Sequence, residues 1–154
     1  MKGLDLESAI PPGATILIDT SVALAYLTGT ELASPAAEQL FDAFVATGRN
    51  AAALSVVTVG EILVRPFKAG PSAVATAEGF LRHFGEIRLL DVTYDVAREA
   101  ARIRAATGLR MPDALVIASA LISEVEIVVT NDRAWTAAMT PIAPEISFCT
   151  LEAR

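Results

Sequence analysis

Cysteine and histidine are almost absent from this sequence, which contains one residue of each, Cys149 and His83. A single cysteine cannot form an internal disulfide, and so low a cysteine content agrees with a reducing compartment. Cys149 stands in the apolar segment 146–150 and has no evident histidine partner, so we interpret it as a small hydrophobic strand residue. Nucleophilic catalysis by a Cys–His or Ser–His arrangement is therefore not expected.

Long apolar runs are also missing from the sequence. A helix that spans a membrane needs about 20 mostly apolar residues. The two most apolar stretches, 51–64 and 114–130, are interrupted by Glu61 and by Glu124 and Glu126. The first ten residues lack the basic and then apolar pattern of a signal peptide. We therefore expect a cytoplasmic protein without a membrane segment.

Basic residues are outnumbered, since 12 Lys and Arg face 18 Asp and Glu and the net charge is −6. Proteins that bind nucleic acid usually carry a basic excess, so this balance weakens a nucleic-acid hypothesis. An acidic protein can still bind RNA through a local basic strip or through cations held by its own carboxylates. Aromatic residues are few, at 6%, while hydrophobic residues make up 53%. This supply predicts a globular core built from Ala, Val, Leu and Ile.

Apolar segments rich in β-branched residues alternate with longer helical patterns along the 154 residues. Short strands separated by helices predict βαβ crossovers, and hence an α/β fold with a parallel sheet that is covered on both faces. We expect strands at 14–19, 51–56, 87–92, 125–130 and 146–150. Residues 1–14 are expected to form an N-terminal lead-in, followed by a single domain over 15–154.

Ser, Thr, Pro and Gly mark the expected ends of the helices. Ser34 is expected to cap a helix over 34–47, and Thr93 is expected to cap another that ends near Gly108. Pro66 is expected to bend or end the helix that follows the second strand, because proline lacks the backbone donor that a helix interior requires.

Four acidic residues stand apart from the polar helix faces that hold most acids of this chain: Asp19, Glu61, Asp113 and Asp132. Two of them follow strands and two lie in the first turns of helices, so all four are expected at the carboxyl edge of the sheet, where parallel α/β proteins bind ligands. Two unit charges about 4 Å apart repel by about 4 kcal/mol at a dielectric near 20. Four such carboxylates therefore favour a bound divalent cation. Oxygen ligands without His or Cys select Mg²⁺ or Mn²⁺ over zinc.

Three of these acids also have a simpler interpretation. Asp19 could be only a helix N-cap, Asp132 a turn or cap residue, and Asp113 a complement to the helix dipole, and each of these is the less favoured interpretation. Glu61 is harder to explain in this way, because its neighbours Val59 and Ile62 are apolar and a carboxylate buried among them needs a partner.

The chain contains four segments that resemble, in order and spacing, the motifs of the PIN-domain ribonucleases: ILIDTSVALAYL, SVVTVGEILVRP, LRMPDALVIASAL and VVTNDRAW. Within that family they look most like the VapC toxins of type II toxin–antitoxin pairs. The resemblance extends from about Thr15 to Thr150. It implies a three-layer α/β/α fold with a mostly parallel five-stranded sheet.

The resemblance also implies an activity, namely hydrolysis of RNA phosphodiester bonds with Mg²⁺ or Mn²⁺ held by Asp19, Glu61, Asp113 and Asp132. It implies supporting polar roles for four neighbours: Thr20, Ser21, Thr130 and Asn131. It further implies a homodimer and a cognate antitoxin that covers the acidic groove. The basic residues nearest the motifs are candidates for contact with RNA phosphate, and Arg110 is the foremost of them: Arg65, Lys68, Arg110 and Arg133.

Two other functions are compatible with the same motifs. The acidic net charge is consistent with a non-catalytic PIN-fold binding module, and a PIN nuclease that processes RNA outside a toxin–antitoxin pair would carry the same acids. A phosphatase of the haloacid dehalogenase type is disfavoured, because that class places two aspartates as D-x-D after its first strand and here Asp19 is followed by Thr20 and Ser21. A P-loop motif is absent from the sequence.

Overall fold

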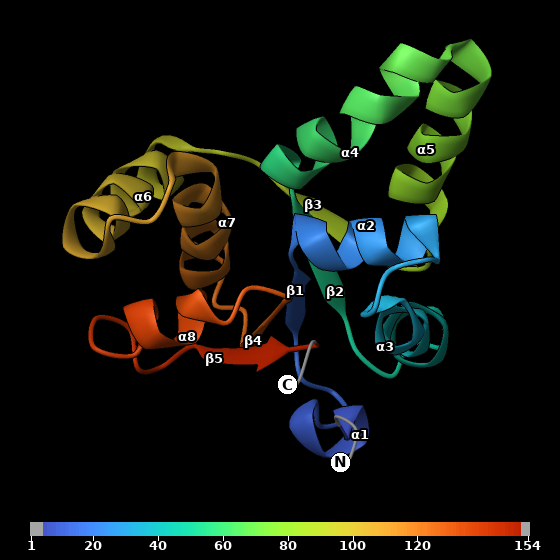
Figure 1. Cartoon of the computed structure of the whole chain (residues 1–154). Coiled ribbons are helices and arrows are strands. Elements are labelled where there is room, and N and C mark those ends of the chain that lie inside the picture. The colour runs from blue at the N-terminus through green and yellow to red at the C-terminus, as the bar shows by residue number, and fades with distance from the viewer. Residues whose placement is uncertain (1–4, 152–154) are drawn as a thin grey trace.

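The computed structural model of the protein describes residues 5–151. Its centre is a five-stranded sheet in the order β3-β2-β1-β4-β5, in which every strand pair is parallel (Figure 1). The predicted α/β fold with a five-stranded sheet is therefore confirmed. The strands are β1 (Ile16–Ile18), β2 (Ala52–Ser55), β3 (Ile87–Leu90), β4 (Ile127–Thr130) and β5 (Ser147–Thr150).

Helices cover both faces of the sheet. In Figure 1, α2 and α3 lie on one side of it, α6, α7 and α8 lie on the other, and α4 and α5 form a hairpin that projects beyond it. Within residues 5–151, no helix has the length and the apolar character needed to cross a membrane. The helices are α1 (Leu6–Ala9), α2 (Thr20–Thr28), α3 (Ser34–Glu38), the π-helix η1 (Gln39–Val45), α4 (Val56–Ala69), α5 (Pro71–His83), α6 (Tyr94–Thr107), α7 (Met111–Ile122) and α8 (Ala134–Met139).

The strand residues alternate between two hydrophobic cores, because successive side chains of a strand point to opposite faces of the sheet. Ile16 and Ile18 of β1 pack with residues of α1, α2 and η1. Leu17, between them, packs with residues of α6, α7 and α8. Both cores consist mainly of Ala, Val, Leu and Ile, as the composition predicts.

The central position of β1 decides where a ligand can bind. Ile16 of β1 lies opposite Ala52 of β2 on one side and opposite Ile127 of β4 on the other. Connections that leave a central strand toward both sides open a crevice at the carboxyl ends of the strands. Because α2 starts directly after β1 and α4 directly after β2, the first residues of both helices border that crevice.

The helix expected over 34–47 is present as two parts, the α-helix α3 and the π-helix η1 that continues it. The expected cap by Ser34 is wrong, because the N-cap is Ala33 and Ser34 is already helical. The Ser34 hydroxyl instead donates to the carbonyl of Ala25 at 2.7 Å. This side chain therefore ties α3 to α2 and does not satisfy the first turn of its own helix. Thr93, in contrast, caps α6 as expected, since its side chain accepts a hydrogen bond from the Val96 N–H.

Pro66 lies inside α4, which continues to Ala69, so of the two expected effects, a bend or an end of the helix, the end is wrong. Proline removes one backbone donor, but the Pro66 carbonyl still accepts a hydrogen bond from the Gly70 N–H at 3.0 Å. α4 also packs along α5 (Figure 1). This packing holds the last turn in place and offsets the missing donor.

The segment before β1 contributes to the first core. Leu6 of α1 and Ile10 just after it are buried there. The side-chain amide of Asn50 donates to the carbonyls of Pro11 and Ala14, both at 2.9 Å. The start of the domain at residue 15 stays a prediction, while the residues ahead of it pack against the same sheet.

Candidate functional site

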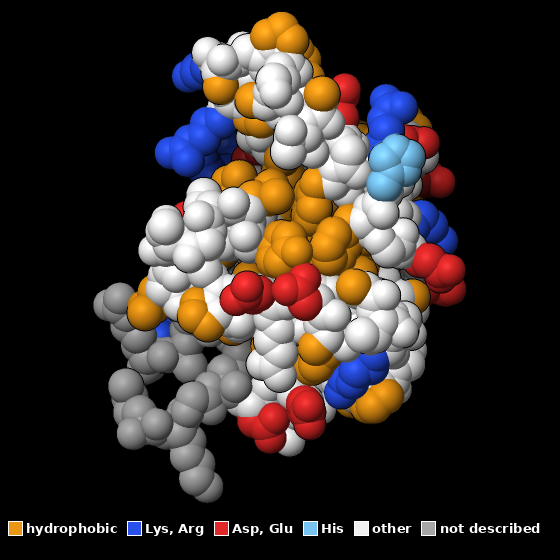
Figure 2. Space-filling model, turned by 90° about the vertical axis from the view of Figure 1, so that its right-hand side faces the viewer, with side chains coloured by type: hydrophobic (Ala, Val, Ile, Leu, Met, Phe, Trp, Pro, Cys, Tyr) orange, Lys and Arg blue, Asp and Glu red, His pale blue; other side chains and the backbone are white. Residues whose placement is uncertain are grey.

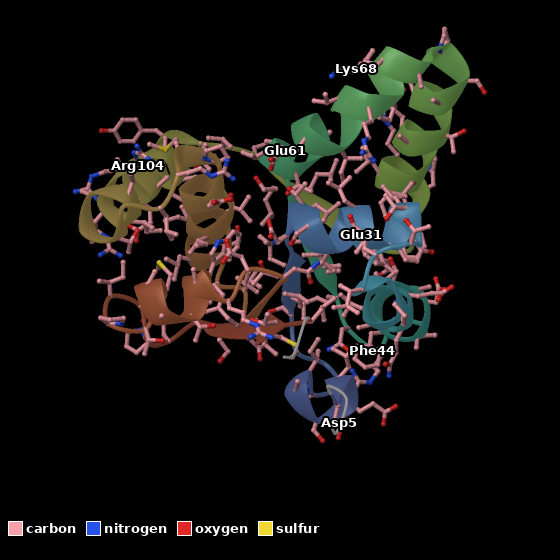
Figure 3. All side chains as sticks on the ribbon, in the orientation of Figure 1. Asp5, Glu31, Phe44, Glu61, Lys68 and Arg104 are labelled. Atoms are coloured by element: carbon pink, nitrogen blue, oxygen red, sulfur yellow. The ribbon has the colours of Figure 1, made fainter. Side chains whose placement is uncertain are left out.

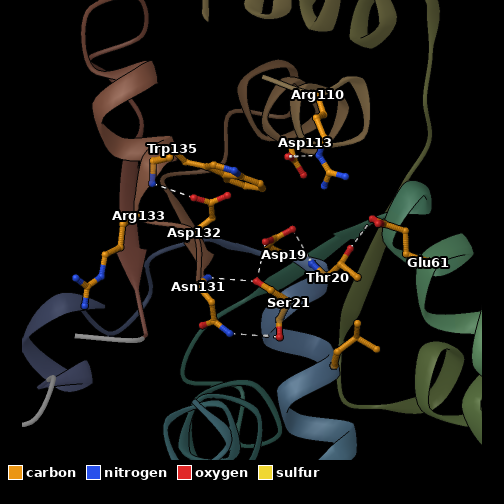
Figure 4. A pocket seen from close by; sticks show the side chains of 12 residues that line it. Asp19, Thr20, Ser21, Glu61, Arg110, Asp113, Asn131, Asp132, Arg133 and Trp135 are labelled. Atoms are coloured by element: carbon orange, nitrogen blue, oxygen red, sulfur yellow. Dashed lines mark hydrogen bonds and ion pairs between the residues drawn. The ribbon is translucent and has the colours of Figure 1, made fainter. Parts of the chain in front are cut away.

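One cavity of about 780 Å³ lies at the carboxyl ends of β1 and β4, and all four predicted acids line it (Figure 4). Asp19 follows β1, Glu61 belongs to α4, Asp113 belongs to α7, and Asp132 lies in the turn after β4. The structure thus brings together, around one cavity, four carboxylates that are far apart in the sequence.

Asp19 is the most enclosed of the four acids, with 6% of its surface exposed. Its Oδ1 accepts the Thr20 N–H at 2.7 Å, and its Oδ2 accepts the hydroxyls of Ser21 and Thr130 at 2.8 and 2.9 Å. Burial raises the pKa of this carboxyl; the hydrogen bonds offset part of the rise, and the nearby charge of Asp113 adds to it. Asp19 is also the N-cap of α2, so the cap interpretation holds alongside a buried, oriented carboxylate.

Glu61 lies in the second turn of α4 and is exposed to solvent. The expectation that its apolar neighbours bury it is wrong, because successive residues of a helix are about 100° apart around its axis. Ile62 faces the core while Glu61 faces the cavity. Oε1 of Glu61 accepts the Thr20 hydroxyl at 2.8 Å, and that hydroxyl also lies 2.9 Å from the hydroxyl of Thr58. These contacts join α4 to α2 and orient the carboxylate.

Asp113 and Asp132 are held less firmly. Asp113 lies in the first turn of α7, and its Oδ2 is 3.5 Å from Nε of Arg110, the N-cap of that helix. Asp132 is exposed, and its Oδ1 accepts the Ala134 N–H at 2.9 Å. The bond to the first residue of α8 fits the turn interpretation of Asp132.

The predicted supporting residues link α2 to the turn after β4. The Ser21 hydroxyl accepts the Asn131 N–H at 3.2 Å, and the Asn131 amide donates to the Ser21 carbonyl at 3.4 Å. Thr130, whose hydroxyl donates to Asp19, accepts the Asp132 N–H at 3.0 Å. The first and the fourth motif are thereby fixed relative to each other.

A divalent cation fits the donors of this cavity, although the side chains do not surround one as they stand. Among residues 5–151, no three His, Cys, Asp or Glu side chains lie close enough together to hold an ion. The acids nevertheless share one cavity, and a donor set of carboxylate oxygens suits Mg²⁺ or Mn²⁺. Binding therefore requires the more exposed carboxylates to turn toward Asp19, which three hydrogen bonds hold in place.

A family model described as the PIN domain matches residues 16–138. The chain belongs to the PIN-domain family. The membership expected from the four sequence motifs is therefore confirmed. No curated protein matches the sequence.

Solved structures resemble this PIN domain at low sequence identity. A toxin–antitoxin complex from Klebsiella pneumoniae has a TM-score of 0.65 and 21% identity, and the match covers 90% of this chain and 99% of that one. The toxin VapC20 from Mycobacterium tuberculosis, which cleaves the sarcin–ricin loop, has a TM-score of 0.65 and 20% identity over 80% of this chain and 94% of its own. DNA-bound VapBC from Salmonella typhimurium has a TM-score of 0.63 and 19% identity over 90% and 99%. At these identities the likeness shows the fold.

The basic residues of this PIN domain differ in their relation to the cavity. Arg110 and Arg133 line it, although the guanidinium of Arg133 points away from the acids in Figure 4. Arg65 lines a neighbouring groove. Lys68 lies near the far end of α4 from Glu61 (Figure 3). Arg110 is paired with one of the acids, Asp113, with 3.5 Å between Nε and Oδ2.

Sequence reasoning missed three residues that line the cavity, Leu24, Ala134 and Trp135. Leu24 belongs to the apolar pattern of α2, which gives no sign that one of its residues reaches a polar site. Trp135 lies in the first turn of α8, three residues after Asp132, and this short separation in the sequence was the available signal. Because Trp135 is aromatic, the sequence favours a position in the hydrophobic core, and the residue is indeed only 1% exposed.

An apolar groove of about 590 Å³ adjoins the acidic cavity, and Leu24 lines both. The groove lies between α2, α4 and α5, and Ile62, Pro66 and Phe80 form part of its wall. Figure 2 views the molecule from the side that carries α5, and it shows apolar side chains gathered at the centre of that face with charged ones around them.

Proposed function

We propose that this protein is a metal-dependent endoribonuclease of the cytoplasm and the toxin of a type II toxin–antitoxin pair. The observation that carries the proposal is the cavity that all four carboxylates line, with Asp19 buried and fixed by three hydrogen bonds. PIN-domain membership and the likeness to VapC toxin structures support it. The lining of the cavity includes no Cys or His, and the hydroxyls of Thr20 and Ser21 are engaged as donors to Glu61 and Asp19, which agrees with attack by water.

In this proposal Asp19, Glu61 and Asp113 bind Mg²⁺ or Mn²⁺, and Asp132 contributes from the rim. When bound, such a cation lowers the pKa of a coordinated water and neutralises charge that develops on the phosphate. Thr20, Ser21 and Thr130 keep the carboxylates of Asp19 and Glu61 in position through their hydrogen bonds. Arg110, at the cavity wall, binds a phosphate oxygen of the RNA.

The proposed partners are a cognate antitoxin and a second copy of the chain. The similar structures include a toxin–antitoxin complex and two VapBC structures bound to DNA. The groove between α2, α4 and α5 adjoins the acidic cavity, so a segment seated there would also reach the site. The dimer is proposed from the family resemblance alone, because the apolar residues of α2 and of 34–47 are largely buried within the chain.

Cleavage of RNA by the purified protein tests the proposal. With Mg²⁺ or Mn²⁺ the protein should cut RNA, and Asp19→Asn should lower the rate by more than about 100-fold, the upper end of losses for partners of metal ligands. Asp95→Asn is a matched control, because Asp95 is an exposed acid in the first turn of α6, outside the cavity. Equal cutting by the Asp19 variant and the parent would reject the site.

Growth assays separate a toxin from a nuclease that processes RNA outside such a pair. Expression of this chain alone should arrest growth, and coexpression of the neighbouring gene product should restore it. A processing nuclease would cut RNA in the test tube and leave growth unchanged.

A non-catalytic PIN-fold module is the second candidate, favoured by the wide separation of the carboxylates among residues 5–151 and by the net charge of −6. Titration with Mn²⁺ followed by calorimetry and thermal melting distinguishes the two. An enzyme of the proposed kind binds the ion and melts at a higher temperature, while the module does neither.

A further inference from the structure

Trp135 carries a buried hydrogen-bond donor that has no partner. It is the only tryptophan of the chain, and its Nε1 is enclosed without an acceptor among residues 5–151. Its ring packs edge-on against Phe148, with ring centroids 6.4 Å apart, and belongs to the second core. The ring therefore cannot turn its N–H to solvent. Buried polar groups are rarely left unpaired, so this one calls for an acceptor.

Asp113, in turn, is a hydrogen-bond acceptor that lacks a well-placed donor among the described residues. Asp19 accepts three hydrogen bonds, and Glu61 and Asp132 each accept one. Among the described residues, the Asp113 carboxylate has only Nε of Arg110 at 3.5 Å, on a side chain that is largely exposed. Asp113 is thus the one acid of the cavity that no firmly held donor orients.

Trp135 and Asp113 face the same space, which Asn131 also lines, and the side-chain oxygen of Asn131 is likewise buried without a partner among the described residues. Trp135 and Asp113 both line the acidic cavity. In Figure 4 the indole extends from α8 toward the start of α7, where Asp113 lies. Ala114, the residue after Asp113, packs in the same core as Trp135. A rotation of the Asp113 side chain is therefore the change that would pair the two groups.

We propose that the indole N–H of Trp135 donates a hydrogen bond to the Asp113 carboxylate when a divalent cation is bound, and that Trp135 thereby positions this ligand. Donors behind a metal ligand fix its orientation and strengthen its binding. The same rotation releases Arg110 from Asp113, and its guanidinium becomes available to a phosphate. This inference rests on the proposed metal binding.

A nuclear magnetic resonance titration tests the hydrogen bond directly, because a single tryptophan gives a single indole N–H signal. Addition of Mg²⁺ to the full-length protein should move that proton signal downfield, and EDTA should reverse the change. Calorimetry with the same ion reports binding independently. An indole signal that stays in place while Mg²⁺ binds would overturn the inference alone, whereas absence of Mg²⁺ binding would overturn the proposed function and the inference together.

Replacement of the indole separates the N–H from the shape of the ring. Substitution of Trp135 by 3-benzothienylalanine keeps the ring system and removes the donor, and it should weaken Mg²⁺ binding about 10-fold. 5-Fluorotryptophan keeps the donor and should retain the parent affinity. Equal affinity of the benzothienyl protein and the parent would reject a positioning role.

Carbon-13 labelling of aspartate identifies the acceptor. In the presence of Mg²⁺, the Asp113 carboxyl signal, assigned through Asp113→Asn, should differ between the parent and the benzothienyl protein. The Asp19 signal should not change, because its three donors are independent of Trp135. A change at Asp132 in place of Asp113 would overturn the assignment of the acceptor.

Discussion

The buried carboxyl of Asp19 links protein stability to pH. Its pKa in the folded protein is raised above the ordinary value of 3.8, chiefly by burial. Folded protein therefore holds the Asp19 proton at pH values where the unfolded chain has released it. Stability contributed by the protonated form is present below 3.8 and is lost as pH rises through the raised value.

We expect a pH-dependent difference between the parent and Asp19→Asn when both are measured in EDTA. As pH rises through the window above 3.8, the free energy of unfolding of the parent should fall relative to that of the variant, whose residue 19 does not titrate. Urea denaturation at several pH values gives this difference. A difference that stays constant with pH would mean that Asp19 ionises in the folded protein as it does in the unfolded chain.

At the residue level, the sequence predicted four acids that line one cavity, but it did not predict how far each of them is buried. The argument that a charge between apolar residues must be buried holds for Asp19 and fails for Glu61, because helix geometry turns Glu61 outward. Trp135 could not be selected, since nothing in a sequence tells whether an indole N–H in a core finds an acceptor. That information exists only once the neighbours are placed.

At the level of elements, alternation of apolar segments predicted all five strands and most of the helices, because periodicity follows directly from which side is buried. The failures have one cause. Each unexpected feature depends on contact with another segment of the chain. The Ser34 hydroxyl donates to Ala25 of α2, and the last turn of α4, which follows Pro66, packs on α5. The helix α1 is held by Leu6, which packs in the first core. Local rules for caps and prolines describe an isolated helix and cannot include such contacts.

The segment that precedes β1 is expected to contribute to the stability of the domain. Ile10 is fully buried in the first core, so Ile10→Ala should lower the free energy of unfolding by about 2–5 kcal/mol, the range for large-to-small core substitutions. Glu7→Ala, at an exposed position of α1, should change it by less than about 0.5 kcal/mol. Urea denaturation measures both. A small effect of Ile10→Ala would mean that the segment adds little to the domain.

Over the whole molecule, the net charge of −6 opposes the binding of RNA, so under the proposed function the few basic groups near the cavity make the contact with phosphate. Arg110→Gln should weaken RNA binding and reduce the slope of log affinity against log salt by about 0.7, the value for one phosphate contact on a single strand. Arg102→Gln is the control, since Arg102 pairs with Glu99 and does not line the cavity. An unchanged slope for Arg110→Gln would remove this residue from the RNA interface.

The hydrogen bond from Thr130 to Asp19 spans 111 positions of the chain, and β1 has β4 as its neighbour on one side. During synthesis on a ribosome, β1 is made early, and its pairing with β4 can form only after β4 has been synthesised. A growing or truncated chain that stops before β4 therefore carries Asp19 without one of its donors and without Asp132. We expect such fragments to lack the proposed ribonuclease activity, so that this activity would begin only after β4 has been synthesised.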